Sequence, residues 1–311
     1  VVAVALKPRP PMTMASFGRP CWAVNGRAYA CAGVRPLGPM IGSGGGTPEV
    51  RMAMIGGLVH DLGEVYIDPR HGEADADRAL DIVSYQQLVV HPHVGALLLT
   101  QLTNYPASLP RAIAEHHERL DGTGYPHALQ RDKVSPLGRL LAVTEGVLAS
   151  LRSDKPSLAR ASIALRAVPG EFDLDWVGHV ARAARTEPEL QTEVDLDEVQ
   201  VRLARLDAAL HAAQDSAAAM VPKAESPALK DALGLTLHLL HRLRTGWYAS
   251  GLWSAEAVAA DDAAEVERVE DELSFRLAAI ERAARLRAGQ LPPGDAHRLD
   301  LLCGALQGTP G

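Results

Sequence analysis

Apolar residues recur three or four positions apart along most of this chain, which is the spacing of one face of an α-helix. In the first half, this pattern predicts helices over about 50–63, 83–103 and 109–119, and another that begins after Ser135 and Pro136. We found no segment of useful length that alternates between apolar and polar residues, as a half-buried strand does. The sequence therefore predicts an all-α fold.

Long amphipathic patterns fill residues 190–311, which we expect to form a helical bundle. The residues expected at its packed seam are Leu240, Leu243, Trp247, Leu273, Leu277 and Ile280. A helix cannot leave such an apolar stripe in water, so these helices must pack on one another or on a second subunit. We interpret this region as an interaction or dimerisation bundle, with a homodimer through the C-terminal helices as one alternative.

Residues 1–49 differ in composition from the rest of the chain. Several prolines and a run of glycines interrupt every helical or strand pattern there, and we expect this segment to be poorly ordered. The sequence thus divides into three regions: a Gly/Pro-rich segment at 1–49, a helical domain at 50–185 and the bundle at 190–311.

Composition and charge exclude some classes of function. Hydrophobic residues make up 47% and charged residues 22%, which fits a globular protein with a buried core. The net charge of −7 argues against a nucleic-acid partner, because such proteins need a basic surface. No apolar run approaches the length of about 18 residues that a membrane-spanning helix requires, so we expect no membrane segment. Three cysteines without a CxxC pair favour a cytoplasmic location.

The histidines carry the clearest chemical signal. Seven of the 12 lie between residues 60 and 127, and most of these stand beside a second group that can bind metal. The relevant steps are His60-Asp61, His91-Pro92-His93 and His116-His117-Glu118. Imidazole nitrogens and carboxylate oxygens bind Zn, Fe, Mn and similar divalent ions. The constellation therefore predicts a metal site.

Three motifs extend this prediction to a family. They are His60-Asp61-Leu62-Gly63, His91-Pro92, and His116-His117-Glu118-Arg119-Leu120-Asp121-Gly122-Thr123-Gly124-Tyr125-Pro126. In order and spacing they resemble the motifs of the HD-GYP domain, a branch of the HD superfamily of metal-dependent phosphohydrolases, over about residues 50–185. The resemblance implies an all-helical enzyme of bacterial signal transduction. Such an enzyme hydrolyses cyclic di-GMP at a centre of two or three divalent ions, often iron or manganese.

The resemblance also implies roles for individual residues. The metal ligands would be His60, Asp61, His91, His116, His117 and Glu145, with His60 and Asp61 as the catalytic residues. Glu145 stands where the family has an aspartate. The substrate would contact the loop residues Asp121, Gly122, Gly124, Tyr125 and Pro126. The loop chemistry is consistent with this role, because its glycines permit positive φ and a close backbone approach.

Two departures from the family pattern bear on activity. The family has a phosphate-binding lysine three residues after the metal-binding aspartate. This chain has Glu64 at that position, a candidate substrate-binding residue whose carboxylate would repel phosphate; the alternative is that Glu64 is an extra metal ligand. The family also supplies a further histidine ligand upstream of the His-Asp step, but residues 1–59 contain no histidine. His93 is a candidate substitute, although two residues apart on a helix point to different sides.

Two functions from different classes follow. The first is a metal-dependent phosphodiesterase that hydrolyses cyclic di-GMP, with a phosphohydrolase acting on another nucleotide as a variant. The second is a catalytically degenerate HD-GYP domain. It would sense a nucleotide or bind a diguanylate cyclase or another signalling protein.

Overall fold

The computed structural model describes residues 47–66, 88–151, 157–186, 195–250, 263–289 and 291–306. In these ranges every regular element is a helix, and an isolated bridge between Asp121 and Gln130 is the one strand-like pairing. The prediction of an all-α fold is confirmed. The segment 1–49, expected to be poorly ordered, lies outside the described residues apart from Thr47, Pro48 and Glu49.

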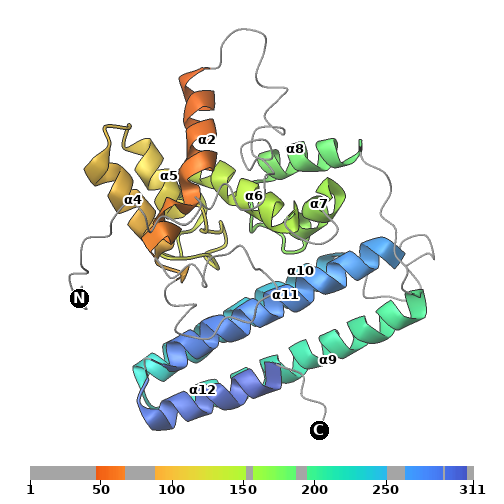
Figure 1. Ribbon diagram of the computed structural model, residues 1–311. Coiled ribbons are helices and arrows are strands. Elements are labelled where there is room, and N and C mark those ends of the chain that lie inside the picture. The colour runs from red at the N-terminus through yellow and green to blue at the C-terminus, as the bar shows by residue number, and fades with distance from the viewer. Residues whose placement is uncertain are drawn as a thin grey trace, which may run out of the picture.

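Short helices form the first part of the fold (Figure 1). They are α2 (Pro48–Val59), η4 (His60–Tyr66), α4 (His91–Leu102), α5 (Ser108–Glu115), η6 (Arg131–Lys133), α6 (Pro136–Leu151), α7 (Leu158–Arg166) and α8 (Leu174–Ala184). Helix α2 begins where the Thr47 side chain accepts a hydrogen bond from the Val50 amide and Pro48 occupies the first turn. Leu99, Leu109, Ile113 and Leu141 form the buried cluster that holds α4, α5 and α6 together.

The predicted helix boundaries need two corrections. The helix expected at 50–63 ends at Val59, and the chain continues as the 3₁₀ helix η4. The helix expected at 109–119 ends at Glu115, because the Glu118 amide turns back to the Glu115 carbonyl and the chain enters a loop. Of the helix expected at 83–103, the part before residue 88 lies outside the described residues, and α4 begins at His91.

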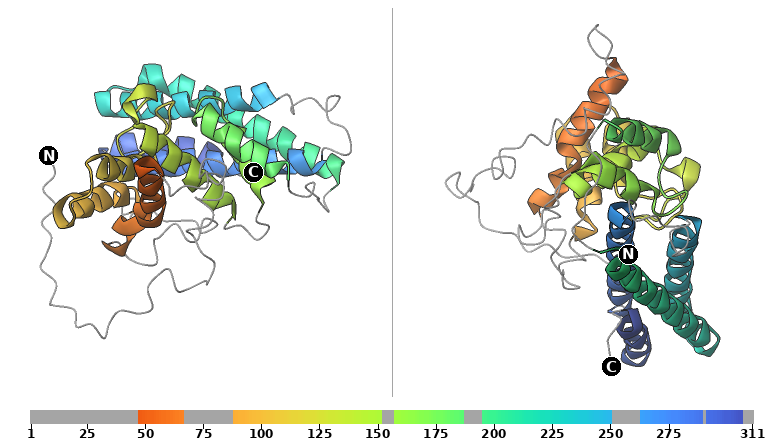
Figure 2. Two further views of the ribbon diagram at one scale, coloured as in Figure 1. Left: turned by 90° about the horizontal axis from the view of Figure 1, so that it is seen from above. Right: turned by 90° about the vertical axis from the view of Figure 1, so that its right-hand side faces the viewer.

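Long helices form the second part. They are α9 (Leu196–Met220), α10 (Pro227–Ser250), α11 (Ala263–Ala288) and α12 (Pro293–Leu306), with the short η7 (Val221–Lys223) after α9. Helix α11 contacts α9, α10 and α12, and the right-hand view of Figure 2 shows the short helices stacked on one side of these long ones. All six residues expected at the seam lie in one buried cluster, so that prediction is confirmed.

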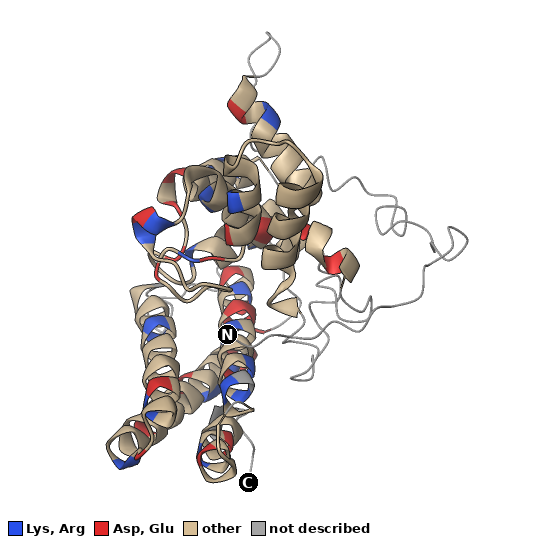
Figure 3. Ribbon diagram, turned by 90° about the vertical axis from the view of Figure 1, so that its left-hand side faces the viewer, with Lys and Arg blue, Asp and Glu red and all other residues tan. Residues whose placement is uncertain are grey.

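Charged residues of both signs are interspersed along the long helices (Figure 3). Several form pairs one turn apart, such as Glu272 with Arg276 and Glu281 with Arg285. No described helix has the length and apolar character needed to cross a membrane.

The two parts share apolar packing. One buried cluster contains residues of both parts. It includes Ile163 of α7 and Val168, which follows that helix, together with Trp247 of α10 and Leu273 of α11. The division of the chain at about residue 185 stays a prediction. The short helices nevertheless bury apolar surface against the long ones.

Candidate metal centre

Asp61 lies at the centre of a cluster of predicted ligands that four segments contribute. Element η4 supplies His60 and Asp61, α4 begins with His91, the end of α5 supplies His116 and His117, and α6 supplies Glu145. Oδ1 of Asp61 lies 3.6 Å from Nε2 of His91 and 3.5 Å from Nε2 of His116. Nε2 of His60 lies 3.0 Å from Oδ2 of Asp61 and 2.9 Å from Oε2 of Glu145.

These side chains fall into two groups that share Asp61. The ligand atoms of Asp61, His91, His116 and His117 all lie within 4.8 Å of one another, and so do those of His60, Asp61 and Glu145. The structure thus brings together all six predicted metal ligands. All of them are buried except Asp61, which is partly exposed.

Gly63 explains how η4 approaches α4 so closely. A Cβ atom at position 63 would overlap the carbonyl oxygen of His91 and lie 2.8 Å from the Gly95 nitrogen. Real side chains do not tolerate such contacts, so only glycine lets the two backbones meet here. This contact sets Asp61 beside His91.

Backbone carbonyls orient three of the imidazoles. Nδ1 of His60 lies 3.0 Å from the Gly57 carbonyl, Nδ1 of His91 lies 2.6 Å from the Leu88 carbonyl, and Nδ1 of His116 lies 2.6 Å from the Ile113 carbonyl. A carbonyl oxygen can only accept, so each Nδ1 carries the hydrogen and each Nε2 faces the carboxylates. This is the arrangement by which proteins prepare histidine for metal binding.

Burial and charge act in opposite directions on the ionisable groups. Burial, with His116 nearby, lowers the pKa of His91 to about 4, and the same causes hold the pKa of His117 well below its usual value. Burial also acts to lower the pKa of His60, but Asp61 and Glu145 outweigh it and raise that pKa well above its usual value. Burial favours protonation of Asp61, yet His60 and His116 keep its pKa well below its usual value. His91 and His117 are therefore neutral near pH 7 and can offer lone pairs to a metal.

The donor set fits a transition metal. Three imidazoles with one carboxylate suit Zn, Fe or Mn, whereas Ca²⁺ and Mg²⁺ prefer sites built from oxygen. The second group, with one imidazole and two carboxylates, is also a mixed nitrogen and oxygen set. The cluster can hold a divalent metal ion.

The predicted substrate loop lies directly against this cluster. The ring of Tyr125 stacks on that of His117, with centroids 4.6 Å apart and planes at 15°. Gly122 has a φ of +85°, and a Cβ at Gly124 would overlap the backbone of Arg119. Gly122 is therefore required by its positive φ and Gly124 by the close approach of the backbone, as the sequence predicted. The Tyr125–Pro126 peptide bond is cis.

Glu118 has a different position from the one that its motif suggested. It belongs to neither of the two ligand groups found among the described residues. Its carboxylate instead accepts hydrogen bonds from the amides of His127 at 2.7 Å and Leu129 at 2.8 Å. Glu118 therefore fixes the far end of the loop. No spacing rule links a carboxylate to amides nine and eleven residues later, so sequence reasoning missed this role.

The remaining candidates lie outside the cluster. Glu64 is partly exposed and follows Asp61 by three residues in a 3₁₀ helix, where such residues lie on the same side. His93 is exposed, its ring centroid lies 6.2 Å from that of His127, and it belongs to neither described ligand group. It does not replace the histidine that the family pattern would place upstream.

Comparison with known proteins agrees with this geometry. Residues 51–167 match the profile of the HD domain family. The chain is 34% identical over 110 residues to a cyclic di-GMP phosphodiesterase of Pseudomonas aeruginosa, an alignment that covers 35% of this chain and 26% of that protein. It is 28% identical over 99 residues to a 3′3′-cGAMP-specific phosphodiesterase of Vibrio cholerae, covering 32% and 21%.

The chain therefore spans about a quarter of the length of these relatives. The family match covers residues 51–167, and both similarities also cover only part of the chain. All six predicted ligands, from His60 to Glu145, lie within residues 51–167. Residues 51–167 are thus similar to the HD domain family, in agreement with the resemblance that the histidine motifs indicated.

Proposed function

We propose that this protein hydrolyses a phosphodiester bond of a cyclic dinucleotide, with cyclic di-GMP as the first candidate substrate. The observation that carries the proposal is the convergence of Asp61 with the imidazoles of His91, His116 and His117 in one cluster. The names of both relatives support the substrate class, because one acts on cyclic di-GMP and the other on 3′3′-cGAMP.

His60 and Asp61 are the proposed catalytic residues, and both are also proposed ligands. Asp61 belongs to both ligand groups and would therefore bridge two ions, one held with His91, His116 and His117 and one with His60 and Glu145. A divalent ion bound there supplies Lewis acidity to phosphate oxygens and lowers the pKa of water. The resemblance favours iron or manganese and a total of two or three ions.

The protein's own residues would orient the substrate. The loop from Asp121 to Pro126 presents backbone beside the ligand cluster, and the Tyr125 ring already covers one face of His117. Stacking on that loop and burial beside Gly122 and Gly124 would hold a nucleotide with its phosphate toward Asp61. Glu64, on the same side of η4 as Asp61, would oppose the approach of phosphate.

Glu64 also favours a second candidate function. If its charge prevents productive phosphate binding, the domain would bind a nucleotide or a signalling protein such as a diguanylate cyclase without turnover. A homodimer through the C-terminal helices belongs to the same proposal. The seam residues that suggested it are buried within the chain, so a dimer would need a different surface.

The deciding experiment measures metal content and hydrolysis on the same purified, full-length protein. We expect bound Fe or Mn, and release of a linear product from cyclic di-GMP in the presence of Mn²⁺ or Fe²⁺, with 3′3′-cGAMP as the comparison substrate. Asp61→Asn should abolish both metal binding and hydrolysis. Arg285→Gln, which alters an ion pair of the distant bundle, is the control. Nucleotide binding without hydrolysis by the metal-loaded protein would favour the sensor.

A further inference from the structure

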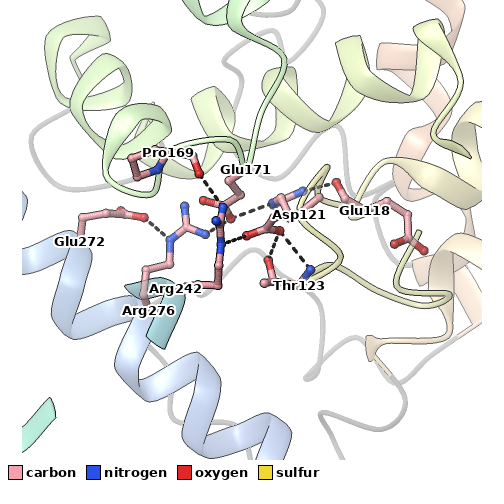
Figure 4. A network of polar contacts seen from close by, with 9 residues as sticks. Glu118, Asp121, Thr123, Pro169, Glu171, Arg242, Glu272 and Arg276 are labelled. Atoms are coloured by element: carbon pink, nitrogen blue, oxygen red, sulfur yellow. Dashed lines mark hydrogen bonds and ion pairs between the residues drawn. The ribbon is translucent and has the colours of Figure 1, made fainter. Parts of the chain in front are cut away.

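A network of charged residues joins the substrate loop to the C-terminal helices (Figure 4). The loop contributes Asp121, the turn between α7 and α8 contributes Glu171, and α10 and α11 contribute Arg242 and Arg276. We call these four residues the junction network. Figure 4 shows both arginines reaching from the long helices toward the loop and the turn.

Asp121 occupies the centre of the loop side of this network. Its Oδ1 accepts hydrogen bonds from the amide of Thr123 at 3.1 Å and from the Thr123 hydroxyl at 2.7 Å. Its Oδ2 lies 3.4 Å from Nε of Arg242, and the Asp121 side chain is only 6% exposed. The carboxylate therefore shapes the first turn of the loop with one oxygen and pairs with the bundle through the other.

Arg242 is itself fixed at a second point. Its Nη2 donates to the Pro169 carbonyl at 2.6 Å. The guanidinium therefore has a hydrogen bond through Nη2 and an ion pair through Nε, and contacts at two nitrogens of a planar group restrict its orientation more than a flexible ammonium group would be restricted. Arg242 thus connects the loop, the turn between α7 and α8, and helix α10.

Glu171 supports the same loop from the neighbouring position. Its backbone carbonyl accepts a hydrogen bond from the Leu120 amide at 2.8 Å, next to Asp121. Its buried carboxylate pairs with Arg276, whose Nε donates to Glu272 at 2.5 Å, and with Nε of Arg119 at 3.3 Å. The loop therefore has one anchor from Glu118 within the HD domain and others from the junction network.

The burial of Asp121 makes its pairing energetically important. An exposed ion pair contributes little to stability, as expected for Arg139 with the fully exposed Asp132. The Arg242 side chain is 30% exposed, but the Asp121 side chain is buried, so removal of Arg242 would leave a buried carboxylate without its opposite charge. Without Arg242, the Asp121 carboxylate would have to turn toward water and release its bonds to Thr123.

We infer that Arg242 is a positioning residue of the candidate site, acting through Asp121 to hold the loop from 121 to 126 in the shape that receives the dinucleotide. The inference rests on the proposed function for the identity of the ligand. It gives the C-terminal helices a supporting part in the site, because Arg242 belongs to α10 and lies outside the residues that match the HD domain family.

The test compares full-length Arg242→Gln and Arg242→Lys with the control Arg244→Gln. Arg244 lies on the same helix but donates to Gln214 within the bundle. In Arg242→Gln we expect faster amide exchange over residues 118–131, an unchanged metal content, and a KM for cyclic di-GMP about tenfold higher with kcat within about twofold. Arg242→Lys, which keeps the charge, should recover part of the KM, and Arg244→Gln should behave as wild type.

A double variant tests the route through Asp121. If Arg242 acts on the loop through this carboxylate, Arg242→Gln should add little to the effect of Asp121→Asn. Additive effects, unchanged loop exchange in Arg242→Gln, or equal loosening in Arg244→Gln would overturn the inference. If the wild type hydrolyses no cyclic dinucleotide, the proposed function fails on its own. Loop exchange and the dissociation constant for cyclic di-GMP then decide the inference about Arg242.

Discussion

His60 and Glu145 are 85 positions apart in the sequence, and Nε2 of His60 lies 2.9 Å from Oε2 of Glu145. Both side chains are buried, and Asp61 approaches the same nitrogen at 3.0 Å. The resemblance places an aspartate at position 145, whose carboxylate would begin one methylene closer to α6. The longer glutamate places its carboxylate in contact with the His60 ring.

This contact makes Glu145→Asp a sharp test of the second ligand group. The shorter side chain should fall short of His60, and metal affinity should decrease by about tenfold, as it does when a supporting metal contact is lost. Titration of the metal-free protein with Mn²⁺ would measure the change. Glu281→Asp, which shortens a carboxylate of the bundle, is the matched control. Equal or tighter binding by Glu145→Asp would show that an aspartate binds the ion from this position as well as glutamate does, and would contradict the expected dependence on side-chain length.

Metal binding should stabilise the fold measurably. A ligand that binds only the folded state at 100 times its dissociation constant adds about 2.7 kcal/mol to the free energy of unfolding. Thermal unfolding should therefore shift to higher temperature with Mn²⁺ and back after chelation with EDTA. In Asp61→Asn the shift should vanish, since Asp61 is shared by both ligand groups. A shift that persists in this variant would place the metal elsewhere.

Glu64→Lys should strengthen the binding of cyclic di-GMP. The substitution replaces a carboxylate that repels the substrate phosphate by an ammonium group that attracts it. Two unit charges 4 Å apart interact by about 1 kcal/mol in water and about 4 kcal/mol near a protein surface. Equilibrium binding to the metal-loaded protein would measure the gain. Glu49→Lys changes the net charge equally at the exposed start of α2 and should have no effect. If the two variants behave alike, Glu64 does not face the phosphate.

The sequence was sufficient to predict the fold class and the convergence of the six candidate ligands. Helical periodicity predicted the long helices and their seam, since Leu240, Leu243 and Trp247 of α10 recur at the spacing of one buried face. The candidate ligands could be predicted because His60-Asp61 and His116-His117 place two metal-binding side chains next to each other, and this can be read from residue types alone. Their convergence required only that the helices pack as the resemblance implied.

Other features depend on contacts that the periodicity of apolar residues does not predict. The end of α5 at Glu115 is set by the turn that presents His116 and His117, and the sequence has no glycine or proline there to mark it. The pairing of Asp121 with Arg242 joins a loop to a helix far along the chain. An arginine within an amphipathic helix resembles any solvated residue, so the sequence contained no signal for this contact.

The apolar cluster shared by the short and long helices gives the last prediction. Ile163 is 7% exposed and packs with residues of α9, α10 and α11, so Ile163→Ala should lower the free energy of unfolding by about 2 to 4 kcal/mol. Leu174→Ala removes a side chain that is 76% exposed and should change it by less than about 0.5 kcal/mol. Because Ile163 is buried against the bundle, calorimetry of the full chain should show one transition that shifts as a whole. Two transitions, with only the less stable one shifted by Ile163→Ala, would instead show that residues 50–185 and 190–311 unfold as separate domains.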